Sequence, residues 1–99
     1  MRKYDVFESP RFRKDKERAR RRGLDVSMID DVVNRLANGE RLPPQYKDHP
    51  LKGDQLGRRE CRVDGKPKGD WLLVYRKIEE VLLLYLVGTG THVDLGLDK

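Results

Sequence analysis

The sequence predicts one α+β domain over residues 1–99, in which two N-terminal helices pack on one face of an antiparallel sheet. Apolar residues recur at helical spacing in residues 25–38, whereas residues 71–75 and 81–87 are continuous apolar runs of strand length. The order of elements is β-α-α-β-β-β, and helices grouped in this way cover one face of a sheet as a two-layer structure. Ninety-nine residues provide one small core.

The N-terminal segment predicts a short strand followed by a helix. Residues 3–7 alternate apolar and polar side chains, as a half-buried strand does. Ser9 and Pro10 are the residue types of a helix N-cap and of a first helical position. Gly23 is a typical helix stop. The helix between them carries eight basic residues, and we expect it either to follow a phosphate backbone or to be a solvated face.

A second helix is predicted to begin after Asp25, a preferred N-cap residue, and to end at Asn38 and Gly39. Its apolar residues form one stripe, which we expect to be buried against the sheet. Because only a few residues separate the two helices, they are expected to form an antiparallel hairpin.

Residues 40–57 have neither a helical nor a strand pattern and predict a long polar loop, of the kind that is usually functional or disordered. Short turns then connect three strands, which predicts an antiparallel meander. The expected strands are residues 58–63, 71–75 and 81–87, and the expected turns are residues 64–69 and 79–80.

The composition indicates a polyanionic partner. Charged residues make up 39% of the chain, and 22 Lys and Arg against 17 Asp and Glu give a net charge of +5. Nucleic acid, an acidic protein or an anionic membrane would attract such a surface. The single Cys61 fits a reducing compartment, and we expect a cytoplasmic protein with no signal peptide and no membrane span. One cysteine and two histidines cannot form a structural zinc site, and no cofactor is expected.

The two histidines are the strongest candidates for chemistry. His49 and His92 both fall in predicted loops near glycines, where functional residues are common. An imidazole can take or give a proton near neutral pH. A pair of them across an RNA phosphodiester can deprotonate the 2′-hydroxyl and protonate the leaving 5′-oxygen, without a metal or cofactor.

Cations around His49 are candidates for phosphate binding, although each one alone is equally consistent with a solvated charge. In a strand, Glu60 and Arg62 would share a face and so could polarise an imidazole and clamp a phosphate. The candidate cations are Lys47, Lys52, Arg58, Arg59 and Arg62.

Asp70 and Trp71 begin the predicted central strand, and each has two interpretations. Trp71 is either a core residue or a platform on which a nucleobase stacks. Asp70 is either a turn residue after Gly69 or a carboxylate that orients a histidine.

The chain contains, in this order, the motifs LPPQYKDHPLKGD, RRECRVDG, DWLLVYRK and VGTGTHVDL. This series resembles the YafQ branch of the RelE/ParE superfamily, the toxins of bacterial type II toxin–antitoxin pairs. The resemblance covers nearly the whole chain and implies the RelE-like, microbial RNase-like fold. It also implies a ribosome-dependent endoribonuclease that cuts messenger RNA in the ribosomal A site.

The resemblance implies partners and site residues as well. A cognate antitoxin, usually a DNA-binding dimer, would block the site, and DNA would be contacted only through it. Carried over by position, the site residues of the family correspond to His49, His92, Asp70, Trp71 and Glu60.

The chain departs from the family at two positions. Arg62 stands where relatives often have a histidine, and Gly96 stands where some have an aromatic residue. His49 is expected to be the general base and His92 the general acid, although the roles can be exchanged. Two alternatives stay open: a ParE-like toxin that binds DNA gyrase without cutting RNA, and a catalytically weak member that only binds antitoxin.

Overall fold

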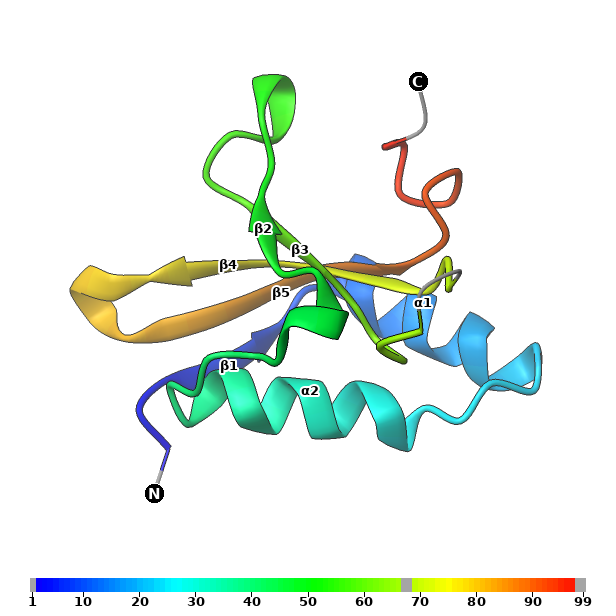
Figure 1. The fold of residues 1–99 in the computed structure, drawn as a ribbon, viewed down its shortest axis with the longest axis horizontal. Coiled ribbons are helices and arrows are strands. Elements are labelled where there is room, and N and C mark those ends of the chain that lie inside the picture. Colours follow the sequence, from blue (N-terminus) through cyan, green and yellow to red (C-terminus); the bar gives the residue numbers. More distant parts are fainter. Residues whose placement is uncertain (1, 67–68, 98–99) are drawn as a thin grey trace.

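The computed structural model describes residues 2–66 and 69–97 and has the predicted two layers (Figure 1). The helices and strands are β1 (Asp5–Glu8), α1 (Pro10–Arg21), α2 (Ser27–Ala37), β2 (His49–Pro50), β3 (Arg59–Arg62), β4 (Leu72–Ile78) and β5 (Leu83–Gly90). Short 3-10 turns are η1 (Pro44–Tyr46), η2 (Gly53–Gln55) and η3 (Glu79–Val81).

The sheet has the order β1-β5-β4-β3-β2, and the predicted meander of β3, β4 and β5 is antiparallel. The fold class is therefore confirmed, with one correction. β1 pairs with β5 in parallel, so the sheet is mixed and not wholly antiparallel. Only strands joined by a hairpin must run in opposite directions, and nearly the whole chain separates β1 from β5.

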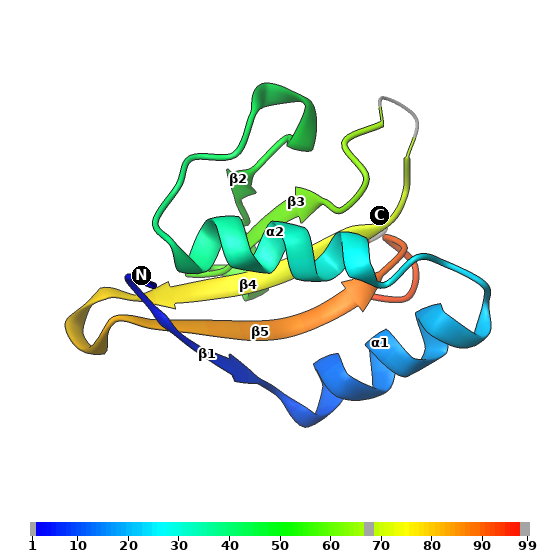
Figure 2. The same ribbon diagram turned by 90° about the horizontal axis from the view of Figure 1, so that it is seen from below.

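Both helices begin close to the predicted positions. The Ser9 hydroxyl accepts a hydrogen bond from the Phe12 N–H at 3.0 Å, and Pro10 is the first residue of α1. The Asp25 carboxylate accepts from the Ser27 N–H at 3.1 Å, so α2 begins at Ser27, one residue later than an Asp25 N-cap predicts. The helices run in roughly opposite directions across the same face of the sheet (Figure 2). No helix in the described part of the chain is long and apolar enough to cross a membrane.

The central strand β4 is buried on both faces, as its continuous apolar sequence predicts. Leu73 and Tyr75 belong to the cluster that packs under the two helices. Leu72 and Val74 belong to a second cluster on the other face. Leu51 of the β2 segment (residues 47–56) and Leu95 and Leu97 of the C-terminal segment (residues 91–97) pack in this cluster. In Figure 1 these two segments rise from the sheet on the side away from α2. We call the face of the sheet away from the helices its open face, and these two segments project from it.

Two segments predicted as loops contain strand. Within residues 40–57, β2 pairs with β3 at the edge of the sheet, with His49 opposite Glu60. β5 continues to Gly90, so the glycine-rich stretch before His92 is mostly strand. Of the predicted turn 64–69, the Gly69 N–H donates to the Lys66 carbonyl at 3.0 Å, and residues 67 and 68 lie outside the described residues.

Candidate active site

The structure brings the two histidines to the same carboxylate. Nε2 of His49 lies 3.7 Å from Oε1 of Glu60, and Nε2 of His92 lies 3.6 Å from the same oxygen. Glu60 is only 4% exposed, whereas the side chains of His49 and His92 are 51% and 45% exposed. The arrangement is thus a buried negative charge beneath two solvent-accessible imidazoles.

The pairing of β2 with β3 places His49. Directly opposite residues of an antiparallel pair point to the same face, so the register puts the imidazole over Glu60. Nδ1 of His49 lies 2.5 Å from the Lys47 carbonyl oxygen, which can only accept a hydrogen bond. Nδ1 therefore carries the proton in the neutral ring, and Nε2 has a free lone pair directed at the cleft.

Asp48 anchors the segment that carries His49. Its carboxylate accepts from the Tyr75 hydroxyl at 2.6 Å and from Nε of Arg59 at 3.2 Å. Burial, and then the hydrogen bond to Asp48, raise the pKa of Tyr75, so the phenol stays protonated and donates. Arg59, a predicted RNA-binding residue, is thus engaged in holding this segment.

His92 lies in a single helical turn, residues 91–97, that follows β5 directly. The N–H of Leu95 donates to the Thr91 carbonyl at 3.0 Å, and the N–H of Leu97 donates to the His92 carbonyl at 2.9 Å. Nδ1 of His92 lies 2.5 Å from Oδ1 of Asp70, whose carboxylate can only accept. Asp70 therefore orients this imidazole, and both rings present Nε2 toward Glu60.

A cleft of about 660 Å³ surrounds the three side chains on the open face of the sheet. The β2 segment and the C-terminal turn form its walls, so it belongs to neither helix. Its lining includes His49, Glu60, His92, Lys52, Gln55 and Gly96.

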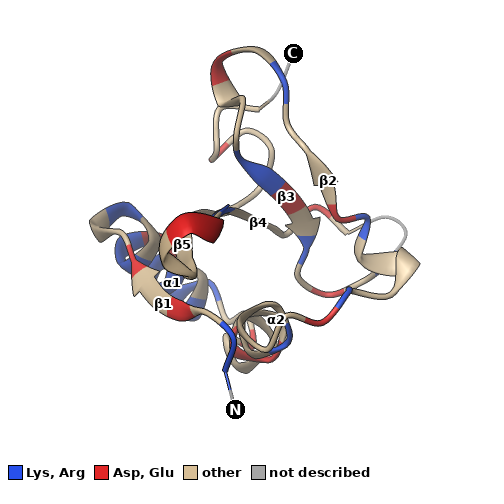
Figure 3. Cartoon of the chain, turned by 90° about the vertical axis from the view of Figure 1, so that its left-hand side faces the viewer, with Lys and Arg blue, Asp and Glu red and all other residues tan. Residues whose placement is uncertain are grey.

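The predicted cations have different positions relative to this cleft. Lys52 lines it, and Arg58 donates to the Gln55 side chain on its wall at 2.9 Å. Lys47 is exposed and contributes its carbonyl to His49. Arg62 donates to the Lys66 carbonyl at 2.6 Å, in the turn beyond β3. Figure 3 shows Lys and Arg on both α1 and β3, with acidic residues interspersed.

Trp71 lies in the core beneath the helices and is 8% exposed. Its indole N–H donates to the Thr89 hydroxyl at 3.1 Å inside the protein. Of the two interpretations of the sequence, this position supports the core residue and not the base-stacking platform, because a buried ring has no free face for a nucleobase.

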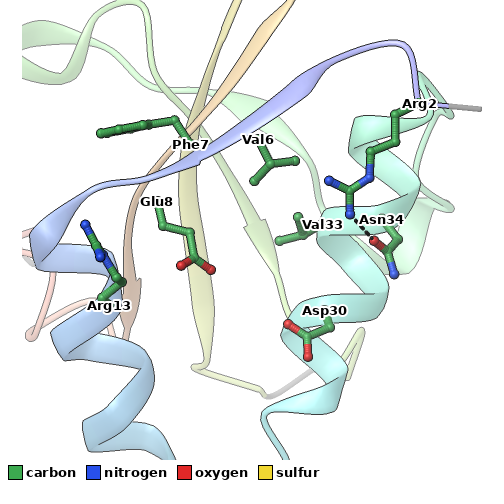
Figure 4. A pocket seen from close by; sticks show the side chains of 8 residues that line it. All are labelled: Arg2, Val6, Phe7, Glu8, Arg13, Asp30, Val33 and Asn34. Atoms are coloured by element: carbon green, nitrogen blue, oxygen red, sulfur yellow. Dashed lines mark hydrogen bonds between the residues drawn. The ribbon is translucent and has the colours of Figure 1, made fainter.

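A second hollow, of about 620 Å³, lies between β1, α1 and α2 on the helical side (Figure 4). Glu8, Arg13 and Asp30 line it, and Arg2 donates to the Asn34 side chain at 3.1 Å. No histidine lines this hollow, so it lacks the residues for acid–base chemistry near neutral pH. Across residues 2–66 and 69–97, no group of three or more His, Cys, Asp and Glu side chains is arranged to hold a metal ion.

The two-layer α+β fold matches the crystal structures of YafQ toxins, which belong to toxin–antitoxin pairs. Residues 4–96 match the family described as "Bacterial toxin of type II toxin-antitoxin system, YafQ". The chain therefore belongs to the YafQ toxin family.

Proteins similar to this chain include the mRNA interferase toxin YafQ of Escherichia coli K12, which is 35% identical over 92 residues, 92% of this chain and 94% of that protein. The crystal structure of the E. coli DinJ-YafQ toxin–antitoxin complex matches with a TM-score of 0.81 at 35% identity, covering 94% of this chain and 97% of that one. A metal-bound toxin from Helicobacter pylori matches with a TM-score of 0.83 at 39% identity, covering 93% and 98%.

Proposed function

We propose that this chain is an mRNA interferase, an endoribonuclease that cuts messenger RNA by acid–base catalysis. The observation that carries the proposal is the convergence of two Nε2 atoms, from His49 and His92, on one oxygen of Glu60. A protein that only binds a partner has no chemical need for this arrangement. The relatives named mRNA interferase toxin YafQ support the same activity.

The reaction needs one base and one acid. Nε2 of His49, unprotonated in the neutral ring, takes the proton of the ribose 2′-hydroxyl as that oxygen bonds to phosphorus. Nε2 of His92 gives its proton to the 5′-oxygen as the bond from phosphorus to that oxygen breaks. The products carry a 2′,3′-cyclic phosphate, which water opens to a 3′-phosphate, and a free 5′-hydroxyl.

The surroundings favour this assignment of the two roles over the exchanged one. His92 has Asp70 at Nδ1 and Glu60 at Nε2, whereas His49 has a neutral carbonyl and Glu60. Asp70 fixes the His92 ring at Nδ1 with Nε2 toward Glu60, and we assign this Nε2 to the leaving 5′-oxygen. Lys52 and Arg58, with Arg62 from the end of β3, are proposed to hold the scissile phosphate.

The proposed setting of the reaction is the ribosomal A site in the cytoplasm. The net charge of +5 favours approach to ribosomal and messenger RNA. A cognate antitoxin is the second proposed partner, as in the DinJ-YafQ complex, and DNA is contacted only through it. No metal is required, because the two imidazoles supply both proton transfers.

A reconstituted translation reaction with a defined messenger tests the proposal. The expected result is arrest with new messenger 5′ ends inside ribosome-protected codons and cyclic phosphate or 3′-phosphate at the upstream fragment. Arrest without new ends would instead indicate a member that binds but does not cut. Inhibition of DNA supercoiling by gyrase, with intact messenger, would indicate a ParE-like toxin.

A further inference from the structure

The turn that carries His92 is closed by a reciprocal pair of hydrogen bonds. The Thr91 N–H donates to Oδ2 of Asp94 at 3.1 Å, and the Asp94 N–H donates to the Thr91 hydroxyl at 3.0 Å. This is the geometry of a capping box, in which two side chains satisfy each other's backbone donors at the start of a helical turn. His92 is the first residue inside the box.

Side chains of α1 and of its C-cap contact the same capping box. Nη1 of Arg22, the C-cap of α1, lies 3.0 Å from Oδ2 of Asp94, and Nη2 of Arg11 donates to the Asp94 carbonyl at 2.8 Å. A third contact lies just before the turn, where the buried Asp15 carboxylate accepts the Thr89 N–H at 3.1 Å. Two side chains of α1, Arg11 and Asp15, and its C-cap Arg22 thus fix the end of β5 and the turn after it.

Two glycines make this close approach possible. A Cβ at Gly90 would lie 2.8 Å from Cβ of Asp94, and its φ of 152° is unfavourable for other residues. A Cβ at Gly88 would lie 2.9 Å from Oδ2 of Asp15 and 3.1 Å from Cδ2 of Leu95. The glycines of the GTGTHVDL motif are therefore explained by packing against α1 and against the turn.

We propose that Asp94 is a positioning residue for His92, and that Arg22 and Arg11 of the basic helix brace it. Asp70 holds the ring at Nδ1 and also accepts the His92 backbone N–H at 3.3 Å, but the side chains of both His92 and Asp70 are about half exposed. The box, braced by α1, supplies the contacts that fix the backbone of the rest of the turn. A displacement of about 1 Å at a reacting group can cost about 100-fold in rate.

The kinetic part of this proposal rests on the proposed ribonuclease function, whereas the structural part does not. The test uses the full chain with Asp94→Ala, Asp94→Asn and Arg22→Gln, each measured in two ways. The first measurement is the ¹⁵N NMR signals of the His92 ring in the free protein. The second is kcat and KM for ribosome-bound messenger.

For Asp94→Ala we expect displaced and broadened His92 ring signals, with the amide signals of the core strands unchanged. The value of kcat should fall about 10- to 100-fold while KM stays within about twofold. Asp94→Asn keeps an oxygen that accepts the Thr91 N–H, so it should regain part of kcat. Arg22→Gln should lower kcat less than Asp94→Ala and still move the ring signals.

Arg21→Gln is the matched control, because Arg21 is a basic neighbour on α1 with no described hydrogen bond or ion pair to the turn. It should leave kcat and the His92 signals unchanged. If the His92 ring signals of Asp94→Ala and Arg22→Gln match those of wild type, the proposal that α1 braces the turn is wrong. It is also wrong if Arg21→Gln loses as much kcat as Arg22→Gln. If the wild-type protein does not cut RNA, the proposed function fails, and the NMR comparison still decides the brace.

Discussion

Replacing Glu60 by glutamine removes the charge between the two histidines and keeps the volume of the side chain. Glu60 lies 3.6 Å from Nε2 of His92. At an effective dielectric constant of about 20, a full charge pair at that distance attracts by about 4 to 5 kcal/mol. Because nearly half of the His92 side chain is exposed, solvent screening lowers this to about 1 to 2 kcal/mol. Since 1.36 kcal/mol corresponds to about tenfold in rate, kcat should fall about 5- to 30-fold.

Single-turnover cleavage of ribosome-bound messenger measures this loss directly. Asp54→Asn is the matched control, because Asp54 lines the same cleft and makes no described hydrogen bond or ion pair with either histidine. The control should stay within about twofold of wild type, and circular dichroism should show that both variants are folded. A Glu60→Gln protein that cuts at the wild-type rate would refute the electrostatic role of the shared carboxylate.

Four further results are expected. Tyr75→Phe should lower the free energy of unfolding in urea by about 1 to 2 kcal/mol, because Asp48 loses a buried donor, and an unchanged midpoint would contradict this. Burial raises the pKa of the Cys61 thiol, so iodoacetamide should label Cys61 at pH 8 only in denaturant. Labelling of the folded protein would contradict the buried position of Cys61 in β3. The Thr91 N–H, and then Arg22, lower the pKa of the Asp94 carboxyl group. The Asp94 carboxylate therefore stabilises the folded state above about pH 4, and this stabilisation is lost as the pH falls further. Thermal melting should accordingly show a smaller loss between about pH 5 and 3 for Asp94→Asn than for wild type. Cleavage should persist when transition metals are removed with 1,10-phenanthroline while Mg²⁺ is kept to hold the ribosome together; its abolition, with recovery on adding a transition-metal ion, would contradict a reaction that needs no catalytic metal in the toxin.

The parts of the fold that the sequence predicted are those with repeating patterns. The apolar stripe of α2 and the continuous apolar runs of β4 and β5 are set by burial, and burial is visible in the order of residues. The prediction of a wholly antiparallel sheet was wrong for β1, which pairs with β5 in parallel. No local pattern records the direction of a strand that no hairpin joins to its neighbour. The extension of β5 through Gly88 and Gly90 was missed because glycine normally indicates a loop.

The candidate site was predicted residue by residue but not as a geometry. Periodicity offers no register for a two-residue strand, so the position of His49 opposite Glu60 could not be derived from the sequence. Asp48 was missed because its partners, Tyr75 and Arg59, come from two other strands.

The capping box beside His92 could have been recognised from the sequence. Thr91 and Asp94 have the Thr-x-x-Asp spacing of that motif, which can be recognised without a structure. Its link to α1 through Arg22 could not be recognised, because 72 residues separate Arg22 from Asp94 and no local pattern connects them.

The most direct test of the central claim measures single-turnover cleavage of ribosome-bound messenger by wild-type protein, His49→Ala, His92→Ala and the double variant. If the two imidazoles act as one acid–base pair, each single variant should lose about 100-fold or more, and the double variant should lose little beyond the worse single one. Wild-type rates in both single variants would show that the imidazoles meeting at Glu60 do not perform the reaction.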